Sequence, residues 1–333
     1  MSQQPAAKTS RVIAIEEHFA TPDFMAGPGH GLSGSAGAAL RMPDLPERLC
    51  DLGDGRIAAM DAAGIDMQVL SLTAPGVEQL EPAESVAQAR RSNDILAEAS
   101  HRHPDRLAGF AALPTPDPAA ASAELSRAVG ELGLKGGVIN GHSRGRYLDD
   151  PFFWPIFERA ETLNVPIYLH PTMPPQPVMA ASYTGNFAPE VGYLLAGAGW
   201  GWHIETAIHV IRIILSGVFD RYPGLQIVIG HLGEGLPFMQ ERLDGRMNLR
   251  LTKLARPFVD YLRGNVHYTI SGFNWTPQFM LLLGEVGIER ILFSADYPYA
   301  PMAEARAFLD QLPISPADKE QIGHGNLEKL LRL

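Results

Sequence analysis

The chain has 333 residues, of which 46% are hydrophobic and 19% are charged, and its formal net charge at pH 7 is −10. This length and composition fit a globular protein with one large core, whereas the acidic balance and the lack of a Lys/Arg-rich run argue against a nucleic-acid partner. No apolar stretch reaches the roughly 18 residues that a membrane-spanning helix needs, so we expect no membrane partner either.

The N-terminus and the cysteine content add two expectations. Residues 1–10, MSQQPAAKTS, are polar and are predicted to form a flexible tail, which leaves residues 11–333 as a single folded domain. Cys50 is the only cysteine, which excludes an internal disulfide and fits a reducing compartment, although a single cysteine is also compatible with secretion. A cytoplasmic location is therefore expected.

Short runs of apolar and β-branched residues alternate with amphipathic segments along the whole chain. The alternation predicts a (β/α)₈ TIM barrel, in which helices cover the outer face of a parallel sheet. The amphipathic segments, with apolar residues three or four apart, predict helices that include residues 83–103, 117–132, 150–164, 203–217 and 303–312. The predicted strands are residues 12–16, 66–72, 107–113, 136–140, 166–170, 226–231, 266–272 and 291–296.

Two connections are longer than a minimal barrel requires. Residues 20–55 and 171–200 are rich in Gly and Pro and follow the first and the fifth predicted strand. In a TIM barrel the loops after the strands build the face that carries the active site, so these two are expected to act as lids or pocket walls. A disordered insertion is the alternative for each.

Several predicted strands end in groups that can bind a metal. The first ends in Glu16, Glu17 and His18, and alternation along a strand places Glu16 and His18 on one side and Glu17 on the other. His170, His231 and Asp296 end three further strands.

A single histidine at a strand end is best explained as a hydrogen-bonded structural residue. Four strands that end in imidazole or carboxylate at one rim are harder to explain in this way, because burying such groups without partners costs several kcal/mol, roughly. The set therefore predicts a site for a divalent metal, Zn²⁺ or a similar ion such as Mn²⁺. His203 and His209 lie in a predicted helix and are assigned structural or surface roles.

Four motifs carry a family resemblance that spans almost the whole chain. They are AIEEHF (14–19), PIYLHP (166–171), WGWHIETAIHVIRIILSGVFDRYPGLQIVIGHLGEGLPFMQERLD (200–244) and ILFSADYPY (291–299). With these motifs the chain resembles the amidohydrolase superfamily, and within it the metal-dependent non-oxidative decarboxylases of aromatic acids, such as γ-resorcylate, 2,3-dihydroxybenzoate and 5-carboxyvanillate decarboxylases.

The resemblance implies a single metal ion held by Glu16, His18, His170 and Asp296. Many hydrolases of the superfamily have His-x-His on the first strand, and the binuclear ones add a lysine at the end of the fourth strand that bridges two metals. Here the first strand has Glu-x-His, and Lys135 precedes the fourth strand instead of ending it. The Glu-x-His form favours an aromatic acid as the substrate.

The resemblance also implies roles for individual residues. Asp296 is expected to protonate the ring carbon, and His231 with Glu234 is expected to form a hydrogen-bonded pair that handles the phenolic proton. Arg242 is expected to bind an anionic group of the substrate through its guanidinium fork. Aromatic side chains expected around the ring are Phe19 and Tyr299, with Trp200, Trp202 and Tyr297 as further candidates.

The expected protein is thus a carboxy-lyase, a homodimer or homotetramer, that removes CO₂ from an ortho-hydroxy or ortho-amino aromatic acid. A mononuclear hydrolase of an ester, lactone or amide would share every metal ligand and is the first alternative. A non-catalytic barrel that binds a small acid or serves as a scaffold is the second, and Asp296 and His231 argue against it, because a scaffold would need neither.

Overall fold

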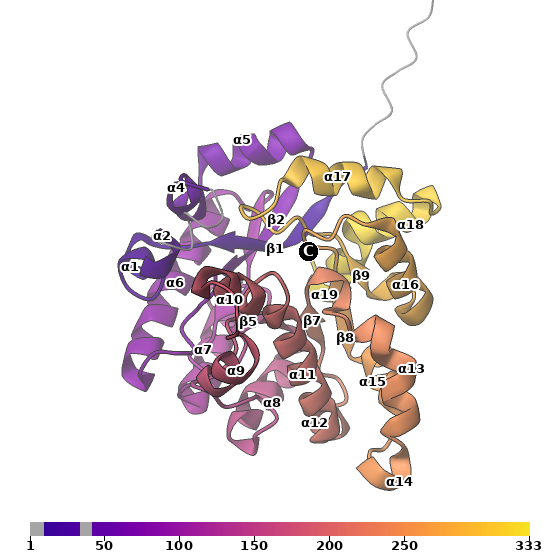
Figure 1. The fold of residues 1–333 in the computed structure, drawn as a ribbon. Coiled ribbons are helices and arrows are strands. Elements are labelled where there is room, and N and C mark those ends of the chain that lie inside the picture. The colour runs from indigo at the N-terminus through magenta and orange to yellow at the C-terminus, as the bar shows by residue number, and fades with distance from the viewer. Residues whose placement is uncertain (1–9, 34–41) are drawn as a thin grey trace, which may run out of the picture.

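The structure is a computed structural model that describes residues 10–33 and 42–333, and its strands form a parallel barrel surrounded by helices (Figure 1). Every strand residue is buried, as expected where side chains fill the barrel and helices cover its outer face. The strands, in chain order, are β1 (Ile13–Phe19), β2 (Met67–Leu72), β3 (Leu107–Gly109), β4 (Ala111–Ala112), β5 (Gly137–Asn140), β6 (Ile167–His170), β7 (Ile227–Ile229), β8 (Val266–Thr269) and β9 (Ile291–Leu292).

The predicted third strand, residues 107–113, is divided at Phe110. β3 pairs with β2 and β4 pairs with β5, and the backbone N–H of Phe110 donates to Leu70 O at 2.8 Å. β3 and β4 are therefore two halves of one strand that pair with different neighbours. The hydrogen bond of Phe110 continues the sheet across the break between them. The barrel closes between its first and last strands, where Ile15 N–H donates to Phe293 O at 3.0 Å and His18 N–H donates to Tyr297 O at 2.7 Å. The predicted (β/α)₈ barrel is confirmed.

The five helices predicted by residue range are present within a few residues of their expected bounds. Several begin with proline, whose missing N–H is not needed in the first turn, and Asp117 caps α7 by accepting from Ala120 N–H at 3.0 Å. The longer helices are α5 (Asp54–Ala63), α6 (Pro82–Arg102), α7 (Pro118–Gly130), α8 (Trp154–Leu163), α11 (Gly201–Leu215), α13 (Leu236–Arg246), α15 (Phe258–Gly264), α16 (Thr276–Val286) and α17 (Met302–Gln311).

Both long connections contain short helices. The first holds α1 (Pro22–Ala26), α2 (His30–Ser33) and α4 (Leu45–Cys50), and its residues 34–41 lie outside the described part of the chain. The second holds α9 (Gln176–Ser182) and α10 (Pro189–Ala196), which lie on the near side of the barrel in Figure 1. The remaining short helices are α12 (Val218–Arg221), α14 (Leu249–Thr252), α18 (Pro316–Glu320), α19 (Asn326–Leu331), η1 (Pro151–Phe153), η2 (His231–Gly233), η3 (Ile288–Arg290) and η4 (Gln321–Gly325).

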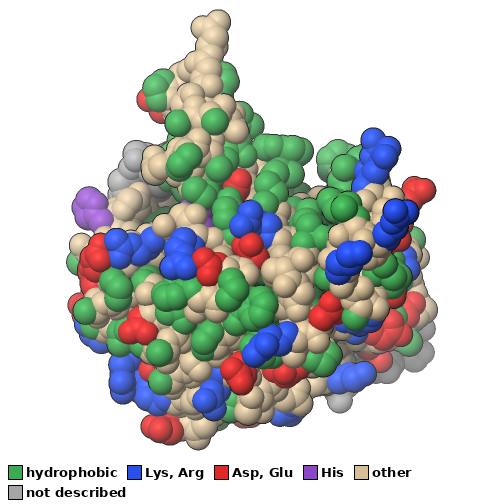
Figure 2. Space-filling model, turned by 90° about the horizontal axis from the view of Figure 1, so that it is seen from below, with side chains coloured by type: hydrophobic (Ala, Val, Ile, Leu, Met, Phe, Trp, Pro, Cys, Tyr) green, Lys and Arg blue, Asp and Glu red, His purple; other side chains and the backbone are tan. Residues whose placement is uncertain are grey.

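The molecular surface carries more than scattered apolar side chains. Hydrophobic side chains gather between charged ones on the face shown in Figure 2. The most exposed of the large ones are Phe238 on α13 at 80%, Leu251 on α14 at 69% and Trp275 at 65%. No described helix combines the length and apolar character needed to span a bilayer. Of the predicted tail only Ser10 is described, so the division into a tail and a single domain stays a prediction.

Candidate active site

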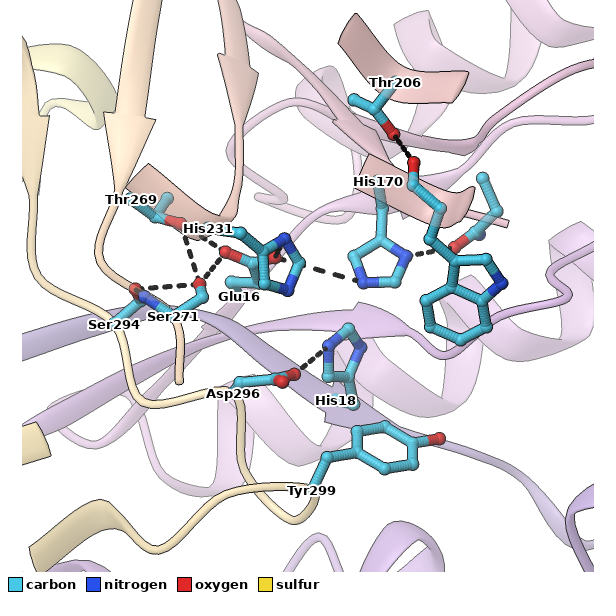
Figure 3. A network of polar contacts seen from close by, with 12 residues as sticks. Glu16, His18, His170, Thr206, His231, Thr269, Ser271, Ser294, Asp296 and Tyr299 are labelled. Atoms are coloured by element: carbon cyan, nitrogen blue, oxygen red, sulfur yellow. Dashed lines mark hydrogen bonds and ion pairs between the residues drawn. The ribbon is translucent and has the colours of Figure 1, made fainter. Parts of the chain in front are cut away.

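Glu16 reaches the inside of the barrel through a bulge in β1. The pairing of β1 with β2 shifts register between Ile15 and Glu17, and Glu16, the extra residue, has a left-handed φ of 71°. A bulge of this kind re-aims a side chain. The hydroxyls of Thr269 and Ser271 donate hydrogen bonds to Glu16 Oε2 (Figure 3).

The second oxygen of this carboxylate, Oε1, is buried and has no hydrogen-bond partner among the described residues. It lies 3.7 Å from Nδ1 of His231 and 4.0 Å from Nε2 of His170. Gly230 makes room for it, because a Cβ at that position would lie 2.3 Å from Oε1. A buried carboxylate oxygen without a partner is costly, and a cation beside it would satisfy it.

His18 and Asp296 form a cluster with Glu16 and His170. Nε2 of His18 lies 3.0 Å from Oδ1 of Asp296, and the ring of His18 meets that of His170 edge to face with centroids 4.7 Å apart. Neither ring nitrogen of His18 makes a hydrogen bond to a described residue. The Asp296 side chain is 19% exposed, so one carboxylate of the cluster can meet a molecule that enters from solvent.

The orientation of His170 is set by an amide outside the cluster. Nδ1 of His170 lies 3.1 Å from Oδ1 of Asn140, which accepts its proton and leaves Nε2 as the free lone pair. The backbone N–H of Asn140 in turn donates to Oε1 of the buried Glu78 at 2.7 Å. His170 is thus held in the tautomer that a metal ligand requires.

The four predicted ligands, Glu16, His18, His170 and Asp296, are therefore neighbours in space. Together they offer two carboxylate groups and two imidazole rings. Oε1 of Glu16 and both ring nitrogens of His18 are buried and make no hydrogen bond to a described residue. This donor set fits a divalent cation that accepts both oxygen and nitrogen. Ligation by these four side chains stays a proposal.

The expected pair of His231 and Glu234 is present and has a third member. Nδ1 of His231 lies 2.8 Å from Glu234 Oε1, while Nδ1 of His203, on α11, lies 2.5 Å from Glu234 Oε2. Nitrogen and oxygen atoms of these three side chains lie within 4.8 Å of one another, close enough to hold a metal, yet the contacts with Glu234 are already hydrogen bonds. We therefore treat the three as a polar relay beside the cluster.

His203 was assigned a structural or surface role from the sequence, and its position beside the cluster, hydrogen-bonded to Glu234, was not predicted. Helical periodicity shows which residues share a face of a helix but not which end of the helix meets the barrel rim. The signal that could have identified His203 is its position in the first turn of the helix that follows the long loop after β6.

Burial dominates the electrostatics of the four-residue cluster. It raises the pKa of Glu16 to about 7 and that of Asp296 to about 7. It lowers the pKa of His18 to about 3 and that of His170 well below its usual value. Both histidines are therefore neutral at physiological pH, which is the form that binds a metal.

The polar relay behaves differently, because it contains its own counter-charges. Burial alone would lower the pKa of His231, but the Glu234 and Glu16 carboxylates outweigh it and raise that pKa to about 10. Burial alone would raise the pKa of Glu234, but His231 and the hydrogen bond from His203 bring it down to about 2. Glu234 and His231 thus form a buried ion pair.

The residues predicted to contact substrate lie in three different environments. The Tyr299 ring meets the His18 ring at 5.3 Å, and its hydroxyl lies 2.6 Å from Thr73 Oγ1. Phe19 is fully buried in the hydrophobic core, and as the neighbour of His18 on a strand it faces the opposite side, so its expected contact with substrate gains no support. Arg242 has an exposed side chain on α13, and its contact with substrate stays a prediction.

The other aromatic candidates also separate. Trp202 lies beside the cluster, with its ring centroid 6.4 Å from that of His170. Trp200 is 54% exposed, and Tyr297 lies under the guanidinium of the buried Arg56 at 4.9 Å. Trp202 therefore joins Tyr299 as an aromatic neighbour of the cluster.

Comparison with known proteins identifies the family of the chain. The amidohydrolase family model matches residues 22–333. γ-Resorcylate decarboxylase of Polaromonas sp. strain JS666 is 40% identical over 334 residues, which cover 96% of this chain and 98% of that protein. Dihydroxybenzoic acid decarboxylase from Polaromonas sp. JS666, solved with bound manganese and the inhibitor 2-nitroresorcinol, has a TM-score of 0.88 at 39% identity over 97% of each chain. 5-Carboxyvanillate decarboxylase from Novosphingobium aromaticivorans, solved with manganese and 4-hydroxy-3-methoxy-5-nitrobenzoic acid, has a TM-score of 0.89 at 35% identity over 100% of each chain. The chain belongs to the amidohydrolase family.

Proposed function

We propose that this protein is a metal-dependent decarboxylase that removes the carboxyl group of an ortho-hydroxy or ortho-amino aromatic acid as CO₂. The observation that carries the proposal is the buried, unpartnered Oε1 of Glu16. It lies within 4.0 Å of His170 in the cluster and of His231 in the adjacent polar relay. Full-length similarity to decarboxylases of aromatic acids supports this reaction over others of the fold.

Glu16, His18, His170 and Asp296 would hold one divalent ion, Mn²⁺ or Zn²⁺. Mn²⁺ is favoured by the manganese bound in two similar structures, although the mixed oxygen and nitrogen donors suit both ions. When bound, the ion supplies Lewis-acid stabilisation of negative charge on the substrate's carboxylate and its ortho oxygen.

The proton transfers would be carried out by the chain's own side chains. Asp296, whose side chain is partly exposed, delivers a proton from its protonated carboxyl group to the ring carbon that bears the substrate's carboxylate, after which the C–C bond breaks and its electron pair returns to the ring as CO₂ leaves. His231 handles the phenolic proton, since Glu234 occupies its Nδ1 and leaves Nε2 for the substrate. Tyr299 and Trp202 form aromatic walls, and Arg242 binds an anionic group.

Assembly into a homodimer or homotetramer is proposed from the exposed apolar side chains on α13 and α14. Phe238 and Leu251 are too exposed to contribute to the core of one chain, and such side chains concentrate at protein interfaces. A cytoplasmic location is proposed from the single cysteine, Cys50, which has no disulfide partner.

The proposal is tested by stripping the protein with a chelator, reloading it with Mn²⁺ or Zn²⁺, and measuring CO₂ release. The panel contains ortho-hydroxy and ortho-amino benzoates, with para-hydroxybenzoates as matched controls, because these cannot offer the carboxylate and a ring substituent to one ion together. We expect CO₂ only from the ortho acids. Hydrolysis of esters, lactones or amides without CO₂ release from any acid would instead select the mononuclear hydrolase.

A further inference from the structure

Glu17, between two proposed metal ligands, has no part in the chemistry described above, yet its side chain is fully buried. Its carboxylate lies at the seam where β1 meets the segment after β9. Oε1 accepts the backbone N–H of Ala295 at 2.7 Å, and Oε2 accepts the backbone N–H of Tyr297 at 3.1 Å. These are the two residues that flank Asp296.

The backbone pairing between β1 and the segment after β9 explains why a side chain accepts from these two amides. Backbone bonds join the strands at Ile15 with Phe293 and at His18 with Tyr297, but the bulge at Glu16 interrupts the ladder between them. Buried N–H groups require acceptors, and the Glu17 carboxylate supplies one for each of the two amides. The same bulge that aims Glu16 inward thus leaves a gap that Glu17 fills.

The two bonds also constrain Asp296. This residue has a left-handed φ of 68°, which a non-glycine residue adopts only when its surroundings hold it there. In this conformation its Oδ1 lies 3.0 Å from His18 Nε2. We infer that Glu17 is a positioning residue, whose carboxylate fixes the peptide groups on both sides of Asp296 and thereby aims the Asp296 side chain into the cluster.

The site requires a group that only accepts hydrogen bonds. Besides the two amides, Nε2 of Gln68 donates to Glu17 Oε2 at 3.2 Å, so three donors converge on one carboxylate. An amide side chain at position 17 would place its own NH₂ against at least one of them. Glu17→Gln therefore removes at least one of the hydrogen bonds to this side chain with almost no change in its volume.

This inference rests on the proposed role of Asp296 and is tested with Glu17→Gln in the full-length protein. Glu124→Gln is the matched control, because Glu124 is also buried and hydrogen-bonded, to Asn93 and Arg127, but not to the backbone on either side of Asp296. For Glu17→Gln we expect Mn²⁺ affinity of the chelator-stripped protein to fall by roughly 10- to 100-fold, the range for residues that orient ligands. We expect kcat to fall with it, while KM stays within a few-fold and the control retains both.

Hydrogen exchange provides a second measurement that does not depend on catalysis. In the wild-type protein the amides of Ala295 and Tyr297 should exchange slowly, and in Glu17→Gln they should exchange faster than the amides of β9. Gln68→Met removes one donor to Glu17 but leaves the hydrogen bonds from Ala295 and Tyr297. It is the second variant to measure if Glu17→Gln does not fold, and it should keep both amides protected.

The outcomes separate the inference from the proposed function. Weaker Mn²⁺ binding and faster exchange in Glu17→Gln support the positioning role even if no acid is decarboxylated. A folded Glu17→Gln with unchanged Mn²⁺ affinity and unchanged exchange overturns it, as does rapid exchange of either amide in the wild-type protein.

Discussion

At the scale of single residues, the two carboxylates of the cluster differ in access to solvent. Glu16 is completely buried, whereas the side chain of Asp296 is 19% exposed. A group that must protonate a bound substrate has to reach it, so the difference divides the work between them. Glu16 is suited to ligation alone and Asp296 to ligation and proton transfer.

Asp296→Asn should separate these two roles. An amide oxygen still coordinates weakly, but the amide is useless as an acid, so we expect the variant to keep at least part of its metal and to lose turnover by a factor of roughly 10² or more. It should also fail to exchange solvent deuterium into the ring position of the product phenol. Metal content and exchange are measured together, and near-normal exchange in a metal-replete variant would move the proton source to His231.

Asn140 should control metal affinity without touching the metal. Asn140→Leu removes the acceptor that fixes Nδ1 of His170, and we expect Mn²⁺ affinity to fall by roughly 10- to 100-fold. Asn140→Asp retains an acceptor at this position and should lose less. Titration of the stripped proteins with Mn²⁺ decides the matter, and equal affinities for wild type and Asn140→Leu would contradict the role.

Arg242→Lys should weaken substrate binding more than it alters metal content, because a point charge does not reproduce the guanidinium fork. Arg246→Lys, a second arginine near the end of α13, is the matched control. The measurement is KM for an accepted acid. If both variants keep the wild-type KM, Arg242 lies outside the binding site.

At the scale of secondary-structure elements, local patterns predicted most of the barrel but not its irregular points. The helix expected at 83–103 is α6, and the one expected at 203–217 is α11. The break at Phe110 and the bulge at Glu16 were not predicted, because both depend on which neighbouring strand each backbone group bonds to. Hydrophobic periodicity carries no information on that choice.

The candidate site was likewise predicted only in part from the sequence. That Glu16 and His18 share a rim with His170 and Asp296 could be read from strand ends, since parallel strands finish at one edge of a barrel. The contact of His203 with Glu234 could not, because it depends on how α11 packs against the segment after β7.

Helix α11 also gives a prediction for pH. His209 is buried, its Nε2 accepts the backbone N–H of Leu148 at 2.7 Å, and burial lowers its pKa from 6.5 to about 3. Between these two values the unfolded chain binds a proton that the folded chain excludes. His209 therefore lowers the free energy of unfolding as pH falls from about 6.5 towards 3, by at most roughly 1.4 kcal/mol per pH unit.

The test compares urea unfolding of the wild-type protein and His209→Gln at pH 7 and pH 5. The glutamine keeps an acceptor for Leu148 but does not titrate, so the variant should lose less stability on acidification than the wild type. Equal losses in the two proteins would show that His209 does not contribute.

At the scale of the whole molecule, metal and fold should be coupled. The four proposed ligands come from β1, from the end of β6 and from the segment after β9, so an ion that binds to them would favour the closed barrel over the unfolded chain. Ligand binding at 100 times its dissociation constant stabilises a native state by roughly 2.7 kcal/mol. We expect about one divalent ion per chain, a lower melting temperature after chelation, and recovery of stability and activity with Mn²⁺.

Elemental analysis and calorimetry check this expectation on the same sample. Two ions per chain would contradict a mononuclear centre, and a melting temperature that does not respond to chelation would place the ion outside the barrel.

The closure of the barrel also sets an order of events during protein synthesis. Glu17 and its partner Ala295 are 278 positions apart, so the first strand leaves the ribosome long before the last one exists. At typical synthesis rates this interval is on the order of tens of seconds, during which the strand that carries Glu16 and His18 lacks the neighbour that seals it. Under the proposed ligation the metal site is completed late in the synthesis of the chain, because a chain interrupted before position 296 would carry Glu16, His18 and His170 but lack Asp296, the fourth proposed ligand.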